Sequence, residues 1–240
     1  MNKTLIEING IEIQIIRKKI KNLHLSVYPP DGRVRAAVPE HFTDDNVRLA
    51  FISRLSWVKK KQSEFKNQQR QSERMMVSGE SHYFFGKRYR LEIIERHGKH
   101  EVLIKNYSSL QVFITPNTTA RNRQVLLNEW YRTQLKKRIG KLISKWEVII
   151  GAHVNEFSIK RMKTKWGSCN IEKRRIWINL ELAKKSPQCL EYIVVHEMVH
   201  LLERHHNEKF KKYMNKFLPQ WQICRDVLKS EPLSHEDWQY

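Results

Sequence analysis

The chain has 240 residues, of which 40% are hydrophobic and 29% are charged, with only 8 glycines and 7 prolines. This composition is typical of a folded globular protein of one or two domains and excludes the disordered and fibrous classes. The three cysteines, Cys169, Cys189 and Cys224, are widely spaced and include no CxxC pair, which argues against a disulfide framework and a thiolate zinc cluster. No apolar stretch reaches the roughly 18 residues of a membrane span, and the N-terminus has no signal-like apolar segment, so we expect a soluble, cytoplasmic protein.

The formal net charge is +20 and the isoelectric point is near 10.0. A field of this sign favours polyanionic partners and makes association salt-dependent. Each basic segment taken singly is typical of a solvated helix face. The total charge favours nucleic acid or another acidic partner, although no base-reading motif accompanies it.

The first part of the chain alternates between strand and turn signals. Asn9-Gly10 lies between two alternating apolar segments and predicts a type I′ hairpin. A second hairpin is predicted over residues 24–39, with Pro-Pro-Asp-Gly as its turn. Thr43, followed by two aspartates, predicts the start of a helix that runs to about residue 72. Strand-like alternation then returns over residues 79–115.

The second part begins with a helical pattern from Thr118 to about Ile150. FSIKRM and RRIWINL are predicted strands, separated by the loop KTKWGSCNIEK. Ser186-Pro187 supplies an N-cap and a first helical residue, and a last helix is predicted after Asn207. We therefore expect an α+β protein with a β-rich domain over residues 1–117, carrying one long helix, and a second domain over residues 118–240.

The segment VVHEMVHLLERHH, residues 194–206, places histidines and glutamates in a helix that is apolar around most of its circumference. Such a helix is buried. Buried imidazoles and carboxylates without partners each cost on the order of 1–3 kcal/mol or more. Either neighbouring side chains satisfy these histidines in a core, or they bind a metal ion.

The H-E-x-x-H spacing favours the metal. His196 and His200 are one helical turn apart, so both rings can reach a single Zn²⁺ ion. Glu197 is rotated by 100° from His196, which suits it to hold a water as a general base rather than to bind the metal.

A third ligand is expected because catalytic zinc usually keeps three protein ligands and one open position. His206 is the candidate, and the helix must then end between His200 and His206, since a straight helix would point His206 away from the ion. Glu203 is a poorer ligand and is instead expected to orient a ligand histidine through its second nitrogen. His205 is the less favoured alternative ligand.

TKWGSCN, RIWINLEL and EYIVVHEMVHLLERHHNEKF, in this order and spacing, resemble the YgjP-like family of zinc metallopeptidases, relatives of the SprT-like and WLM proteases. Upstream, PDGRV, WVKKK and GESHYFFGKRYRL also resemble that family, so the likeness covers nearly the whole chain. The resemblance implies His196, His200 and His206 as metal ligands, Glu197 as the catalytic base and a zincin-like C-terminal metallopeptidase domain. It also implies a strand edge that binds an extended peptide.

The expected function is zinc-dependent peptide hydrolysis, directed at nucleic-acid-associated proteins. One alternative is a basic nucleic-acid-associated binding protein with a structural or vestigial metal site, and another keeps the metal chemistry but acts on a non-peptide ester or amide. Cys169 as a thiol nucleophile with His196 or His200 as its base is disfavoured, because no neighbour evidently activates the thiol. Trp166, Gly167, Trp177 and Asn179 are expected to be structural, with Gly167 permitting a turn.

Overall fold

The computed structural model describes residues 3–28, 31–67, 74–162 and 165–230. It has mixed α and β content, as the sequence predicts, and its contacts divide the chain into two compact units, Met1–Gln71 and Ser72–Tyr240. The division differs from the predicted boundary at residues 117/118. The reason is that the strands over residues 81–114 share one hydrophobic core with the helix that follows them.

The first unit is built on a four-stranded sheet in the order β1-β2-β4-β3. Its strands are β1 (Lys3–Ile8), β2 (Ile11–Lys18), β3 (His24–Tyr28) and β4 (Arg33–Pro39). The predicted hairpin is confirmed, because β1 and β2 pair antiparallel and Asn9 and Gly10 have φ of 52° and 73°. The second hairpin is confirmed by the antiparallel pair β3 and β4, whereas Pro29 and Pro30 of its turn lie outside the described residues.

Two helices pack in this unit where the sequence predicts one. They are α1 (Asp44–Ile52) and α2 (Leu55–Asn67), and Thr43 caps α1 as expected by accepting a hydrogen bond from the Asn46 amide. The helix is interrupted at Ser53, whose hydroxyl donates to the Ala50 carbonyl while the Arg54 amide turns to the Phe51 carbonyl. Serine competes in this way with the regular helical bonds. The predicted end near residue 72 lies outside the described residues.

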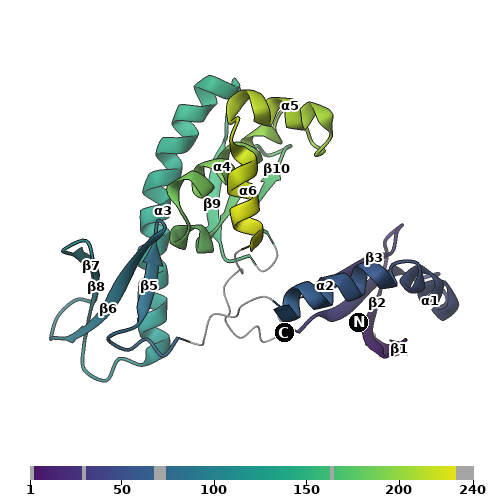
Figure 1. Cartoon of the computed structure of the whole chain (residues 1–240), viewed down its shortest axis with the longest axis horizontal. Helices are drawn as coiled ribbons and strands as arrows, with labels where there is room; N and C mark the ends of the chain where they lie inside the picture. Colours follow the sequence, from purple (N-terminus) through teal and green to yellow (C-terminus); the bar gives the residue numbers. More distant parts are fainter. Residues whose placement is uncertain (1–2, 29–30, 68–73, 163–164, 231–240) are drawn as a thin grey trace. The chain divides into compact units, whose positions relative to one another are not determined.

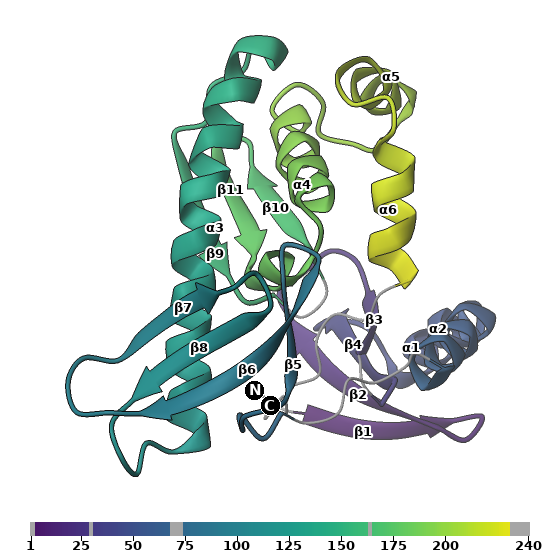
Figure 2. The same ribbon diagram turned by 60° about the vertical axis from the view of Figure 1, so that its left-hand side comes forward.

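The second unit contains two sheets arranged along the helix α3 (Ala120–Ile150) (Figure 1). One sheet has the order β5-β6-β8-β7 and the other has the order β10-β11-β9. Their strands are β5 (Ser81–Phe84), β6 (Lys87–Glu95), β7 (Glu101–Lys105), β8 (Ser109–Ile114), β9 (Glu156–Lys160), β10 (Gly167–Asn170) and β11 (Arg175–Asn179). Figure 2 shows the first sheet beside the N-terminal half of α3 and the second beside its C-terminal half.

The second sheet corrects the predicted loop between β9 and β11. GSCN forms the short strand β10, antiparallel to β11, while β9 and β11 run parallel. Four residues that include glycine, serine and asparagine carry stronger turn signals than strand signals, which hides such a strand in the sequence. Because β10 is at the edge of the sheet, only one of its sides is paired among the described strands.

The remaining elements follow β11. They are a 3₁₀ helix, η1 (Leu180–Lys184), then α4 (Pro187–Val199), α5 (Glu208–Phe217) and α6 (Trp221–Ser230). Ser186 caps α4 and Asn207 caps α5, as predicted, whereas η1 and α6 are not predicted. None of the helices in the described part of the chain combines the length and the apolarity that a bilayer crossing requires.

Candidate metal centre

The helix α4 is buried around almost its whole circumference. Its contacts include α3 on one side and α5, α6 and the strands β10 and β11 on others. Buried residues occur at nearly every position from Cys189 to Val199, which confirms the expectation from its composition. The helix therefore holds its few polar side chains in surroundings where water is scarce.

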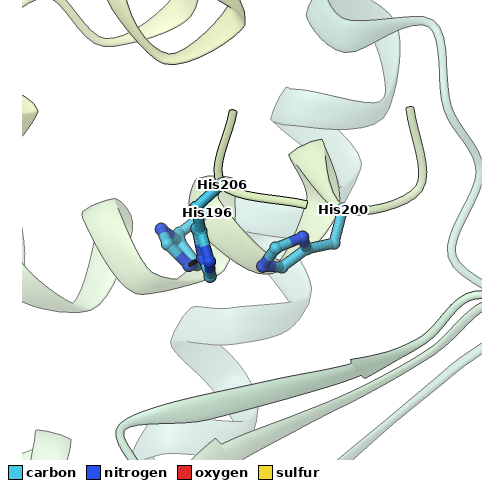
Figure 3. Close-up of side chains that lie close together, drawn as sticks. All are labelled: His196, His200 and His206. Carbon is cyan, nitrogen blue, oxygen red and sulfur yellow. Dashed lines mark hydrogen bonds between the residues drawn. The ribbon is translucent and has the colours of Figure 1, made fainter. Parts of the chain in front are cut away.

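Three histidines meet at the C-terminal end of this helix. His196 and His200 come from α4 and its cap, and His206 comes from the loop that follows (Figure 3). One nitrogen from each ring lies within 4.8 Å of the others, and the Nε2 atoms of His196 and His206 are 2.9 Å apart. The structure thus brings together the three residues that the sequence singled out, whereas His205 lies outside this group.

The loop brings His206 back because α4 ends at Val199 with His200 as its C-cap, one residue before the interval from His200 to His206 in which the stop was expected. The amides of Leu201 and Leu202 bond to carbonyls three residues back, which tightens the last turn. The Glu203 carbonyl then lies 3.1 Å from His200 Nδ1. This contact corrects the expected role of Glu203, since its backbone rather than its carboxylate orients His200, leaving Nε2 of that ring for a ligand.

The Glu203 carboxylate stabilises the turn instead. It accepts a hydrogen bond from the His205 amide at 3.2 Å. That bond is the largest cause that holds the pKa of Glu203 below its ordinary value, with Lys209 adding to it. A carboxylate used in this way is not available as a metal ligand.

The protonation of the histidines suits a metal. Burial, together with the charges of His200 and His206, lowers the pKa of His196 to about 3, and burial also lowers the pKa of His200. Both rings are therefore neutral near pH 7 and present lone pairs, as metal binding requires. His196 Nδ1 is buried without a hydrogen-bond partner among the described residues. Convergent neutral imidazoles of this kind fit a divalent transition metal.

Phe210 supports all three rings from the side of α5. Its ring centroid lies 4.8–4.9 Å from those of His196, His200 and His206. Asn207 caps α5 by accepting a hydrogen bond from the Phe210 amide. This bond holds the backbone of Phe210 in place at the start of the helix. The sequence identifies Phe210 only as a core residue, because its contact with the histidines depends on how α5 packs.

Glu197 lies on the side of α4 that faces β10. It is buried, and this burial raises its pKa to about 8 although the charge of Lys165 opposes the shift. Gly167 makes room for it: a Cβ at this position would come within 2.5 Å of Glu197 Oε1. Gly167 is thus required by close packing rather than by the turn that the sequence suggested.

A cleft of about 1000 Å³ opens over this group. Residues 165–172 line one side, including all of β10, and residues of α4 and the following turn line the other, among them His196, Glu197, His200 and His206. The three imidazoles and the carboxylate therefore face one solvent-accessible space. Such a space can admit an extended ligand between the edge strand and the helix.

Two further residues behave as expected. Burial and the charge of Glu197 raise the pKa of Cys169 to about 12, so this residue is a thiol and not a nucleophilic thiolate near pH 7. Asn179 is fully buried, and its Nδ2 donates to the carbonyls of Met162 and Lys165, both at 2.7 Å. Its Oδ1 accepts from the Glu181 amide, so Asn179 is structural.

Comparison with known proteins gives one match over most of the chain. The model of the YgjP-like metallopeptidase domain matches residues 21–231. No curated protein matches the chain.

Two solved structures are similar over part of it. The metallopeptidase zymogen abylysin of Pyrococcus abyssi is 16% identical, with 41% of this chain and 99% of that chain covered and a TM-score of 0.37. The zymogen jannalysin of Methanocaldococcus jannaschii is 21% identical, with 40% and 91% covered and a TM-score of 0.32.

We predict that Gly167→Ala destabilises the protein by roughly 1–3 kcal/mol, because the added methyl group overpacks the buried Glu197. Gly140→Ala is the matched control. No heavy atom lies within 4 Å of a Cβ there, so in the middle of α3 the same change should stabilise by about 0.4–1 kcal/mol. Denaturant unfolding followed by circular dichroism measures both, and equal effects would contradict the steric role of Gly167.

Proposed function

The chain belongs to the YgjP-like metallopeptidase family, and from this premise we propose that it is a zinc-dependent peptidase with Glu197 as its general base. The observation that carries the proposal is the convergence of His196, His200 and His206 beside Glu197 in one cleft. Family membership gives metal-dependent peptide hydrolysis. The choice of zinc and the roles of the residues are inferred from the side chains.

Zinc is the metal that this set of donors favours. Three imidazoles with one open position are a common catalytic zinc arrangement, and the part of the chain described here offers no carboxylate in the cluster that would favour a harder ion. When bound, zinc supplies Lewis-acid chemistry, which makes water nucleophilic near neutral pH and polarises a carbonyl group. His196, His200 and His206 would hold it.

Glu197 supplies the proton transfer. Its burial disfavours the charged form, which raises its affinity for a proton and matches a base that works near neutral pH. The Glu197 carboxylate takes a proton from water as the oxygen attacks the scissile carbonyl. It then delivers this proton to the leaving amine nitrogen. Contact with Gly167 keeps the carboxyl group beside β10.

A peptide is the substrate that the shape of the cleft favours over a small ester or amide. The edge strand β10 lines the cleft and leaves one side unpaired among the described strands. An extended peptide can add to such an edge through main-chain hydrogen bonds. The scissile bond would then lie between β10 and α4, where Glu197 reaches it.

Nucleic acid is the proposed acidic partner. In the leading proposal, the peptidase binds nucleic acid and cleaves proteins that are bound there. In the alternative function, nucleic acid is the ligand of a binding protein whose metal site is structural. The net charge of +20 favours both. Lys137, Lys141 and Lys145 recur every four residues on the exposed side of α3, so they form one stripe. The three cysteines are free thiols, which supports our proposal that the protein is cytoplasmic.

We predict about one zinc ion per chain in wild-type protein that is depleted of metal, reloaded with zinc and dialysed. His196→Ala should lose this ion, because two imidazoles hold zinc weakly. His205→Ala is the matched control and should keep it, since His205 lies outside the cluster. Elemental analysis by mass spectrometry measures the stoichiometry, and full retention in His196→Ala would exclude this metal site.

We predict that Glu197→Gln retains zinc and loses peptide cleavage by a factor on the order of 10²–10⁴, because it removes the proton acceptor and leaves the ligands in place. Glu129→Gln, on the exposed part of α3, is the control and should match the wild type. Cleavage of a fluorogenic peptide library gives the rates. Wild-type protein that binds zinc and cleaves nothing would favour the alternative function.

We predict that double-stranded DNA binds with an affinity that falls linearly with salt on a log–log scale. Lys137→Ala with Lys141→Ala should lower the slope by about 2, because each contact with a phosphate contributes about 0.9. Lys99→Ala, on an exposed turn, is the control. Fluorescence anisotropy at several salt concentrations measures this, and an unchanged slope would remove the stripe on α3 from the interface.

A further inference from the structure

Peptide hydrolysis develops negative charge on the carbonyl oxygen of the scissile bond, and a donor held in place beforehand lowers the barrier. The residues assigned above include no such donor from the chain itself. Such a donor must reach the reacting carbonyl, so it must be a polar group that lines the cleft. This question rests on the proposed function.

Tyr192 lies on α4 one turn before His196, and both line the cleft. The edge of one ring faces the other, with centroids 5.7 Å apart and planes at 75°. Tyr192 thus offers a neutral hydroxyl donor in the cleft, beside His196, a proposed metal ligand. Its position on the same face of the helix follows from the spacing of four residues.

The ring of Tyr192 is held in a fixed orientation. It stacks on Trp221 of α6, with centroids 6.1 Å apart and planes at 20°. Trp221 is itself fixed, because its Nε1 donates to Asn215 Oδ1 at 2.8 Å. A donor whose side chain is already ordered loses little conformational entropy when a ligand binds.

The hydroxyl of Tyr192 has no hydrogen-bond partner among the described residues, although the side chain is only 5% exposed. The hydroxyl is not among the fully buried, unpaired polar atoms of the described residues, and Tyr192 lines the cleft, so a ligand there can reach it. A tyrosine hydroxyl is ordinarily protonated near neutral pH, so this group is a hydrogen-bond donor. A hydrogen-bond acceptor on a molecule bound in the cleft would give the Tyr192 hydroxyl a partner.

Other donors in the cleft are less suitable. Ser168 lines the cleft, but side chains alternate along β10, so it lies on the opposite face of the strand from Gly167, the residue that contacts Glu197. Asn170 also points that way, and its Oδ1 holds the following turn by accepting from the Lys173 amide. Lys165 and Arg204 are exposed at the surface of the cleft, where water weakens their effect.

We propose that the Tyr192 hydroxyl donates a hydrogen bond to the oxygen of the scissile carbonyl and stabilises the negative charge that develops there. The bond strengthens as the charge grows, so it acts on the transition state more than on the bound substrate. Tyr192 would then be a catalytic residue, while Trp221 would be a positioning residue that fixes its ring.

Tyr192→Phe tests this, because it removes the hydroxyl and keeps the ring that stacks on Trp221. We expect kcat to fall by a factor on the order of 10² while KM, the zinc content and the melting temperature stay within error. Tyr213→Phe is the matched control, since Tyr213 stacks on Phe217 and does not line the cleft. It should leave kcat unchanged.

A second measurement does not depend on turnover. A phosphinic peptide, which mimics the tetrahedral oxyanion, should bind Tyr192→Phe about 10-fold or more weakly than wild type by calorimetry. A cleavage-resistant peptide with an ordinary carbonyl should bind both proteins equally. A raised KM with unchanged kcat, or equal affinity for the phosphinic peptide, would overturn the assignment.

The outcomes separate this inference from the proposed function. Wild-type cleavage that depends on Glu197 but not on the Tyr192 hydroxyl rejects the inference alone. Wild-type protein that neither cleaves peptides nor binds the phosphinic peptide rejects both. Weaker phosphinic peptide binding by Tyr192→Phe, in a protein that cleaves nothing, supports the hydroxyl contact and rejects the peptidase.

Discussion

The site depends on where α4 ends. The helical conformation must reach His200, the C-cap, so that two imidazoles share one face, and it must stop before His206 so that the third ring can turn back. The contact between the Glu203 carbonyl and His200 Nδ1 contributes to both requirements. It closes the turn that follows α4, and it fixes the orientation of the His200 ring. A helix one turn longer would keep the motif in the sequence and separate its third member from the other two.

The second requirement is a dry environment on the protein side of the cleft. Phe210 packs against the three imidazoles, and Gly167 lets β10 approach Glu197 to within contact. Low polarity explains why His196 and His200 are neutral and why Glu197 has a raised affinity for a proton, because burial disfavours the charged form of each group. The same packing that stabilises the fold therefore keeps His196 and His200 neutral, as metal binding requires.

Features with local causes could be predicted from the sequence. The Asn9-Gly10 hairpin, the caps at Thr43, Ser186 and Asn207, and the convergence of the three histidines all follow from residue type and spacing. The metal-binding role of these histidines is still a prediction.

Features that depend on contacts distant in the sequence could not be predicted. The strand β10 exists because β11 pairs with it, and the residues 81–114 join the second unit because their core is shared with α3. The need for glycine at 167 is visible only once Glu197 lies against it. Asn179 holds the carbonyls of Met162 and Lys165 on one side of β10, and Asn170 holds the turn on the other. Amide side chains thus brace this wall of the cleft at both ends, so the position of β10 is set by hydrogen bonds within the polypeptide itself.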